Sequence, residues 1–306
     1  MTTTLELRGI LPAMLTPFTE DGSAIDTTAL AALTNRLVDA GVGGLIPGGS
    51  TGEFAALSHD ERRLLHETVV EAAAGRVPVI AQTGALTAGE AVALSRHAEQ
   101  VGAAGVMVVP PFYDGLSFRE LKAYFTAVAE SIDIPVMIYH IPGVTGQQLT
   151  PDEIGELASI PGVASIKDSG GDAGALTAVQ ERYGDRLQVC NGWDILTYFG
   201  LSYGLKASVW GAANIFPELA VELFETISVK GDLDAARSLW SRLVPVVNWL
   251  DEESYTARVK AATRLLGVQV GPVRSPFQEP TDEALAEVRP LLAELGLPVE
   301  GLASVG

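Results

Sequence analysis

The chain of 306 residues carries 38 acidic and 20 basic side chains, which give a formal net charge of −18. Such a charge repels nucleic acids and anionic membrane surfaces, so we exclude both as partners. Hydrophobic residues make up 47% of the chain, which predicts a compact folded protein, and the longest apolar runs are too short for a transmembrane helix.

Short segments rich in valine and isoleucine alternate with longer amphipathic segments over the first 210 or so residues. The strands that we expect are Gly9–Leu15, Gly43–Pro47, Pro78–Thr83, Gly105–Val109, Pro135–His140, Ala164–Lys167, Gln188–Cys190 and Ala207–Gly211. Segments that are apolar on both faces are typical of parallel strands covered on both sides. The segments between them carry capping-box helix starts at Ser58, Thr87, Ser117 and Thr150.

Eight strand–helix units predict an α/β fold, a (β/α)8 TIM barrel with a C-terminal helical extension. A doubly wound sheet is the alternative, but no GxGxxG motif follows the first strand. The helices expected after Asn214 are Pro217–Val229, Asp232–Leu250, Ser254–Leu266 and Asp282–Leu295. We predict a barrel core over residues 1–214 and an extension over 215–306, packed on the barrel or on a neighbouring subunit, as one structural domain.

Lys167 ends the sixth expected strand, and active sites of such barrels lie at the C-terminal ends of the strands. Burial there would favour the neutral amine, which can attack a carbonyl carbon. For the residue taken alone, a lysine that extends to solvent is the alternative. Lys206 opens the last strand at the opposite face, and we expect the remaining three lysines to be solvated: Lys122, Lys230 and Lys260.

A glycine-rich segment with two hydroxyl groups, Ser50 and Thr51, follows the second expected strand at residues 47–54. Glycines allow a ligand close to the backbone, and the next helical turn offers free N–H groups to an anion. The alternative is that Ser50 and Glu53 form a capping box and only start a helix.

Aromatic residues end two other strands. Tyr139 could relay protons beside a neutral lysine, or it could be a core tyrosine with a satisfied hydroxyl group. His140 points to the other face by strand alternation, so we expect it to be structural. Phe112 and Tyr113 follow the fourth strand, where they could line a pocket or form an oligomer contact.

These four segments together resemble the dihydrodipicolinate synthase / N-acetylneuraminate lyase family of pyruvate-using class I aldolases and lyases, over nearly the whole chain. The resemblance implies that Lys167 forms a Schiff base with a 2-oxo acid and that Tyr139 transfers protons. It also implies that Ser50 and Thr51, with Gly49 beside them, hold the substrate carboxylate.

The same resemblance implies that the backbone carbonyl of Val209 faces the lysine. It further implies that Tyr113 completes a hydroxyl relay in a neighbouring subunit, and that the protein is a homo-oligomer, either a dimer or a tetramer.

Val144 marks a departure from the family pattern, because the synthases carry at this position an arginine that binds the carboxylate of the second substrate. We therefore expect a lyase that cleaves a 2-oxo-3-deoxy sugar acid or a 4-hydroxy-2-oxo acid into pyruvate and an aldehyde. The alternatives are a dehydratase, 4-hydroxy-tetrahydrodipicolinate synthase, and a non-catalytic 2-oxo acid binding or regulatory protein. Trp210 would narrow the pocket if it faces inward, or it packs outward under a helix.

We expect no metal and no organic cofactor. The four histidines are scattered, with His59 and His66 expected on a surface, and no phosphate-binding loop for pyridoxal phosphate follows the last strands. A lone cysteine, Cys190, and a start without signal-peptide character indicate a cytoplasmic protein.

Overall fold

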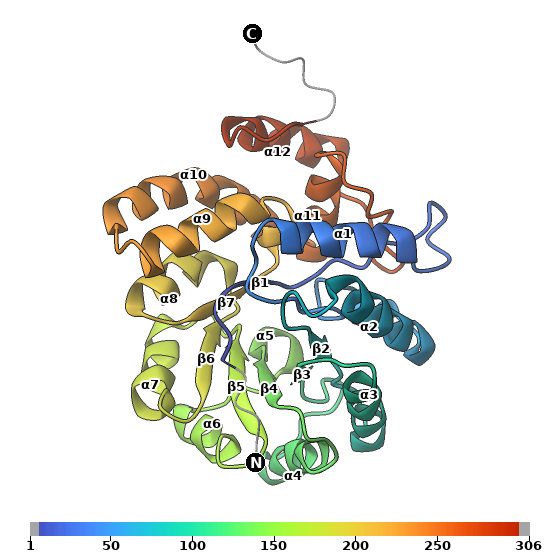
Figure 1. Ribbon diagram of the computed structural model, residues 1–306, viewed down its shortest axis with the longest axis vertical. Coiled ribbons are helices and arrows are strands. Elements are labelled where there is room, and N and C mark those ends of the chain that lie inside the picture. The colour runs from blue at the N-terminus through green and yellow to red at the C-terminus, as the bar shows by residue number, and fades with distance from the viewer. Residues whose placement is uncertain (1–5, 300–306) are drawn as a thin grey trace.

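The computed structural model describes residues 6–299. Its seven regular strands are all parallel and form a curled sheet in the order β1-β7-β6-β5-β4-β3-β2, with helices around the outside (Figure 1). The strands are β1 (Gly9–Pro12), β2 (Ile80–Gln82), β3 (Gly105–Val108), β4 (Val136–His140), β5 (Val163–Asp168), β6 (Gln188–Asn191) and β7 (Ala207–Trp210). Each of them lies at a predicted position.

The segment Gly43–Pro47, expected as a regular second strand, is reduced to two isolated parallel bridges. Ala13 pairs with Ile46 and Leu45 with Val79, so the segment joins β1 to β2 and closes the barrel. A Cβ atom on Gly43 would lie 1.7 Å from the carbonyl oxygen of Arg8, so only glycine permits this close approach. The predicted TIM barrel is confirmed, but the expectation of a regular strand here was wrong.

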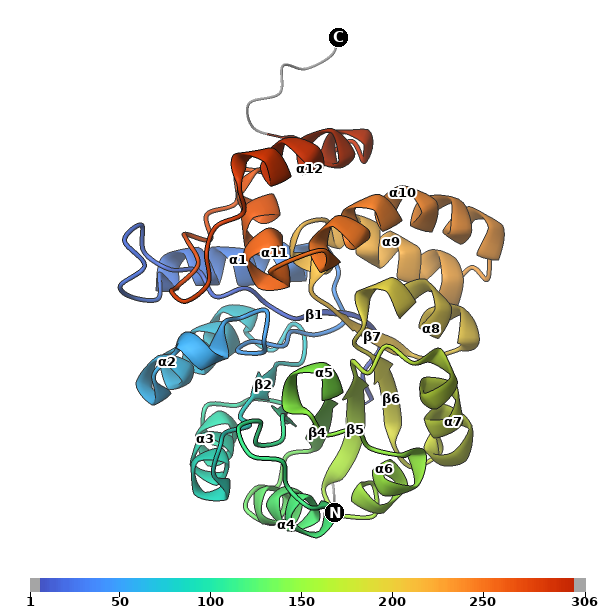
Figure 2. The same ribbon diagram turned by 180° about the vertical axis from the view of Figure 1, so that it is seen from behind.

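Helices alternate with the strands and cover the barrel (Figures 1 and 2). They are α1 (Thr27–Asp39), α2 (His59–Ala73), α3 (Ala88–Gln100), α4 (Phe118–Ala129), α5 (Pro142–Thr145), α6 (Pro151–Leu157), α7 (Ala173–Tyr183), α8 (Thr197–Tyr203) and α9 (Pro217–Ser228). Complete capping boxes start α2, α4 and α6 at Ser58, Ser117 and Thr150. Thr87 caps α3 through the N–H group of Glu90.

Three further helices follow α9, namely α10 (Leu233–Asp251), α11 (Tyr255–Arg264) and α12 (Asp282–Glu294). All lie close to their predicted positions and stack beside α1 and α9 at one side of the barrel (Figure 1). One hydrophobic cluster joins these helices to β1, with Ile10 and Val259 among its buried members. The division of the chain at residue 214 stays a prediction. Between residues 6 and 299, no helix is both long enough and apolar enough to cross a membrane.

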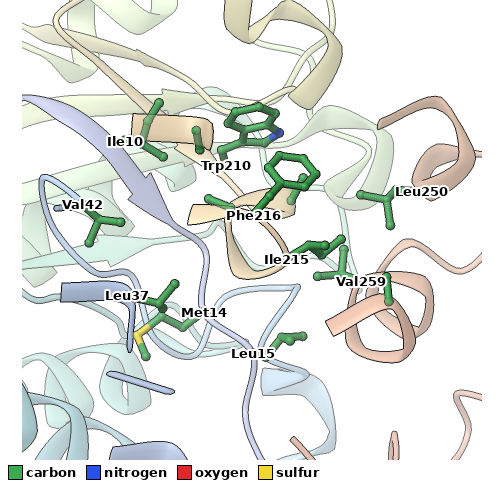
Figure 3. Packing of buried hydrophobic residues seen from close by; sticks show 14 of the residues in the cluster. Ile10, Met14, Leu15, Leu37, Val42, Trp210, Ile215, Phe216, Leu250 and Val259 are labelled. Carbon is green, nitrogen blue, oxygen red and sulfur yellow. The ribbon is translucent and has the colours of Figure 1, made fainter. Parts of the chain in front are cut away.

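Neighbouring residues of β7 face opposite sides of the barrel wall. Val209 belongs to the cluster inside the barrel, together with Tyr139 and Cys190. Trp210 packs outward, with its ring 5.5 Å from that of Phe216 (Figure 3). Of the two orientations left open by the sequence, the structure therefore has the outward one, and Trp210 does not narrow the barrel mouth.

Two expectations about surface residues were wrong. Lys260 is completely buried, and its Nζ donates hydrogen bonds to Thr16 O at 2.8 Å and to Glu53 Oε1 at 2.7 Å. His66 is also completely buried, and burial lowers its pKa to about 3, whereas His59 on the same helix is exposed. Polar residues on amphipathic helices usually face water, so the sequence pattern alone favoured the wrong side for both.

Candidate active site

Lys167 lies at the C-terminal end of β5, with only 5% of its surface exposed. It pairs in register with Tyr139 on β4, and its Nζ lies 4.2 Å from the centre of the tyrosine ring. A Cβ atom on Gly192 would come within 2.6 Å of Lys167 Cγ and Cε, so the absence of a side chain after β6 leaves room for the lysine stem. The lysine therefore does not extend to bulk solvent.

The ends of β4 and β5 are held together beneath this lysine. The Leu149 N–H donates to His140 Nε2 at 3.3 Å, so the proton lies on His140 Nδ1, which donates to Asp168 Oδ1 at 3.0 Å. The Ser169 N–H also donates to His140 O at 2.7 Å. His140 is buried and structural, as predicted.

The glycine-rich loop presents unused donors near Tyr139. The hydroxyl groups of Ser50 and Tyr139 lie 3.4 Å apart. Within residues 6–299, the N–H groups of Ser50 and Thr51 and the Thr51 hydroxyl have no hydrogen-bond partner. The next helical turn has Glu53, not Ser50, in its N-cap position, so the capping-box interpretation was wrong. Three free donors at one strand end can bind a carboxylate.

A cavity of about 280 Å³ opens at this end of the barrel. Six of the eight predicted site residues line it, namely Ser50, Thr51, Tyr139, Val144, Lys167 and Val209. Gly49 lies beside them, and a Cβ atom there would be 3.6 Å from Met107 Cε, inside the barrel. Tyr113 is 85% exposed and does not line the cavity of its own chain. A larger cavity of about 450 Å³ at the opposite end of the barrel contains none of the eight.

Comparison with known proteins shows the family to which this chain belongs. The family model of the dihydrodipicolinate synthetase family matches residues 6–295. The chain belongs to this family. Membership makes it an enzyme of the lyase and synthase type that works through a lysine Schiff base, as the sequence predicted.

Individual relatives are similar over almost their whole length. The 4-hydroxy-tetrahydrodipicolinate synthase of Methanospirillum hungatei is 38% identical over 93% of this chain and 98% of its own. An uncharacterized DapA-like lyase of Halobacterium salinarum is 39% identical over 96% of this chain and 95% of its own.

Solved structures of the family share the fold closely. The dihydrodipicolinate synthase of Aquifex aeolicus has a TM-score of 0.91 and 33% identity, over 96% of this chain and all of that one. YagE of E. coli K12, solved in complex with pyruvate, has a TM-score of 0.89 and 32% identity, over 95% of this chain and 99% of its own.

The sequence analysis missed two cavity residues of this family member, Asp194 and Tyr255. The Tyr255 hydroxyl donates to Asp194 Oδ2 at 2.5 Å, and the Ala212 N–H donates to the same oxygen at 3.3 Å. Burial raises the pKa of Asp194 to about 6, and burial and the neighbouring carboxylate raise the pKa of Tyr255 well above its usual value. Asp194 comes three residues after β6 and could have been found as a strand-end residue. Tyr255, on α11, has no comparable local signal.

Replacing Asp194 with asparagine is expected to raise the free energy of unfolding at pH 7 by about 3 kcal/mol. Because the pKa rises from 3.8 in the unfolded chain to about 6, the folded protein retains a proton between these values that the unfolded chain has lost. Stability therefore falls as pH rises through this window. Asparagine cannot ionise and still accepts a hydrogen bond from Tyr255.

Denaturant unfolding of both proteins at pH 4 and pH 7 measures this effect. We expect the asparagine variant to gain stability relative to the wild type at the higher pH only. An equal difference at both pH values would contradict the raised pKa.

The charges that line the cavity are unevenly distributed. Lys167 is the one basic side chain among its lining residues in the described part of the chain, whereas Asp194 and Asp251 contribute two carboxyl groups. Within residues 6–299, no group of three or more histidine, cysteine, aspartate or glutamate side chains is arranged to hold a metal ion. The expectation of a reaction without cofactors stays a prediction.

Proposed function

We propose that the protein cleaves a 4-hydroxy-2-oxo acid, such as a 2-oxo-3-deoxy sugar acid, into pyruvate and an aldehyde, with Lys167 as the nucleophile. The observation that carries the proposal is the position of its buried amine, beside the Tyr139 phenol and near the free donors of Ser50 and Thr51. The pyruvate complex of YagE, a structure with a TM-score of 0.89, supports this substrate class.

In the proposed reaction the Lys167 amine adds to C2 of the substrate and forms a carbinolamine. The Tyr139 phenol gives its proton to the carbinolamine hydroxyl, which leaves as water, so that an iminium and a phenolate remain. The phenolate then takes the proton of the C4 hydroxyl. The C3–C4 bond breaks, its electron pair moves to the iminium to form an enamine, and the aldehyde is released.

The second half returns the enzyme to its initial state. The Tyr139 phenol protonates C3 of the enamine, which gives the iminium of pyruvate and a phenolate. Water adds to this iminium and loses a proton to the phenolate, and the resulting carbinolamine releases pyruvate and the free amine. Protons lost and gained by Tyr139 balance, so no external acid or base is needed.

The substrate carboxylate needs local donors, because the chain carries a net charge of −18. The N–H groups of Ser50 and Thr51 and the Thr51 hydroxyl, which have no partner in the described part of the chain, can supply them. Fixed dipoles of this kind stabilise an anion without reorganisation of solvent. In this proposal they also hold C2 near Lys167.

The charges of the cavity favour an aldehyde without a carboxylate. Apart from Lys167, no lysine, arginine or histidine of the described chain lines it, and Val144 stands at its rim, 59% exposed.

The names of the relatives favour a second candidate, 4-hydroxy-tetrahydrodipicolinate synthase, and a dehydratase on the same scaffold is a further alternative. Family membership argues against the non-catalytic binder.

Borohydride reduction in the presence of pyruvate tests the proposal. Intact mass and peptide mapping should find one reduced pyruvyl group on the peptide that contains Lys167. Pyruvate release from 2-oxo-3-deoxy sugar acids and 4-hydroxy-2-oxo acids should then exceed condensation with a carboxylate-bearing aldehyde. No adduct with pyruvate or with longer 2-oxo acids would overturn the mechanism, and a preference for the carboxylate-bearing aldehyde would favour the synthase.

The Val144→Arg variant is expected to improve kcat/KM for a carboxylate-bearing aldehyde by about 10-fold to 100-fold, because a charged hydrogen bond contributes about 1.5–3 kcal/mol. The exposed position of Val144 on α5 leaves space for the longer side chain. Val144→Met is the matched control, since methionine adds length without charge. An equal gain in both variants would show that charge is not the determinant.

We also propose that the protein assembles as a dimer or tetramer in which Tyr113 reaches the cavity of a neighbouring copy. The 85% exposure of this aromatic residue in the single chain supports the proposal. Light scattering tests the assembly.

A location in the cytoplasm remains our expectation from the single cysteine, Cys190, which is buried and unpaired.

A further inference from the structure

Helix α11 carries a second buried lysine, which lies outside the proposed chemistry. The Lys260 ammonium donates to the carbonyl oxygen of Thr16 and to Glu53, and lies 4.0 Å from the centre of the Phe18 ring. Both charged side chains of the pair are 0% exposed. A buried ion pair is often no more stable than an apolar replacement, so its presence points to a role in fixing geometry.

Glu53 closes the loop that carries Ser50 and Thr51. Its φ of 57° lies in the left-handed region, which residues other than glycine rarely adopt. One carboxylate oxygen accepts from Lys260, and the other accepts from the Arg274 N–H at 2.8 Å. Two distant segments of the chain therefore hold the end of the loop in a conformation that it would not adopt readily alone.

Helix α11 also contacts the start of the loop that carries Ser50 and Thr51. The Thr256 hydroxyl donates to Ser50 O at 3.2 Å, and Thr256 lies four residues before Lys260, on the same face of α11. Between these contacts, the Thr16 hydroxyl donates to Gly52 O at 2.7 Å. The carbonyl groups of Ser50 and Gly52 and the Glu53 carboxylate thus have partners. The N–H groups of Ser50 and Thr51, two residues that line the cavity, have none within residues 6–299.

We propose that Lys260 is a positioning residue, which holds the Ser50–Thr51 donors in place through Glu53 and so sets the affinity for the carboxylate of the 2-oxo acid. This inference rests on the proposed function and deepens it. Lys260 does not line the cavity, so its effect on substrate passes through the loop. The consequence is specific: loss of the pair weakens carboxylate binding much more than it slows the chemistry at Lys167.

The test measures borohydride trapping of pyruvate as a function of pyruvate concentration. For Lys260→Met we expect the half-saturating pyruvate concentration to rise about 10-fold or more, whereas the maximal trapping rate should change less than about 3-fold. Lys122→Met is the matched control, because Lys122 is a solvated lysine on α4, paired with Glu156. It should leave both quantities at their wild-type values.

A second variant keeps the test decisive if Lys260→Met does not fold. Lys260→Met combined with Glu53→Gln removes both buried charges, so no unpaired ion remains, but the ionic contact to the loop is still lost. Thermal unfolding establishes that each variant is folded. The double variant should show the same rise in half-saturating pyruvate concentration.

An unchanged half-saturating concentration in a folded variant would overturn the inference. A loss confined to the maximal rate would do the same, since it would place the effect on the amine and not on the carboxylate site. Absence of any adduct in the wild type would instead overturn the proposed function. The two failures are therefore distinguishable in one set of measurements.

Discussion

Replacement of Lys167 by alanine is expected to abolish the covalent adduct with pyruvate and to lower kcat/KM for cleavage by more than about 10⁴-fold. Without the amine there is no iminium, so the electron pair of the breaking C3–C4 bond has no acceptor. Intact mass after borohydride treatment measures the adduct, and pyruvate release measures the turnover. The cavity donors remain, so weak binding of pyruvate should persist.

Lys206→Ala provides the matched control for this prediction. Lys206 precedes β7 at the opposite end of the barrel, where it pairs with Glu6 at 2.7 Å on the surface. Its replacement should change neither adduct formation nor turnover. If Lys167→Ala still formed a reducible pyruvate adduct, another amine would be the nucleophile, and the assignment of Lys167 would be wrong.

Tyr139→Phe is expected to lower kcat by about 10²-fold to 10⁴-fold, because the phenol is the proposed carrier of the protons in dehydration, C3–C4 cleavage and protonation of the enamine. Phenylalanine keeps an aromatic ring beside the Lys167 amine, so the packing around the lysine should survive. The pyruvate adduct should therefore still form, but slowly. Single-turnover trapping separates this step from cleavage.

Tyr203→Phe is the control for loss of a phenol elsewhere. Tyr203 lies on α8, and its hydroxyl donates to Glu181 at the surface. This variant should retain wild-type kcat. If the Tyr139→Phe enzyme kept the wild-type rate, another group would have to transfer the protons. The Tyr255 phenol near Asp194 would be the first to test.

Much of the site could be predicted because it depends on local patterns. Strands covered on both sides produce short apolar runs, and in a parallel barrel the ends of all strands meet at one face. Lys167 and Tyr139 each end such a run, and the two lie opposite each other in register. Ser50 and Thr51 follow the same rule, although their strand is reduced to two bridges.

Three features depended on tertiary contacts, two of them between residues far apart in the sequence. Lys260 is buried because Thr16 and Glu53 satisfy its ammonium group across more than 200 residues, and Asp194 depends in the same way on Tyr255. The orientation of Trp210 was decided by packing against Phe216 and the outer helices.

The sequence by itself determined the barrel, the helical extension and the strand-end residues of the site, because periodicity and strand position are properties of neighbouring residues. Only the tertiary structure decided which polar groups are buried and which carboxyl group has a raised pKa. Desolvation and hydrogen bonding depend on what surrounds a side chain in space, and helix α11 brings those surroundings from the other end of the chain.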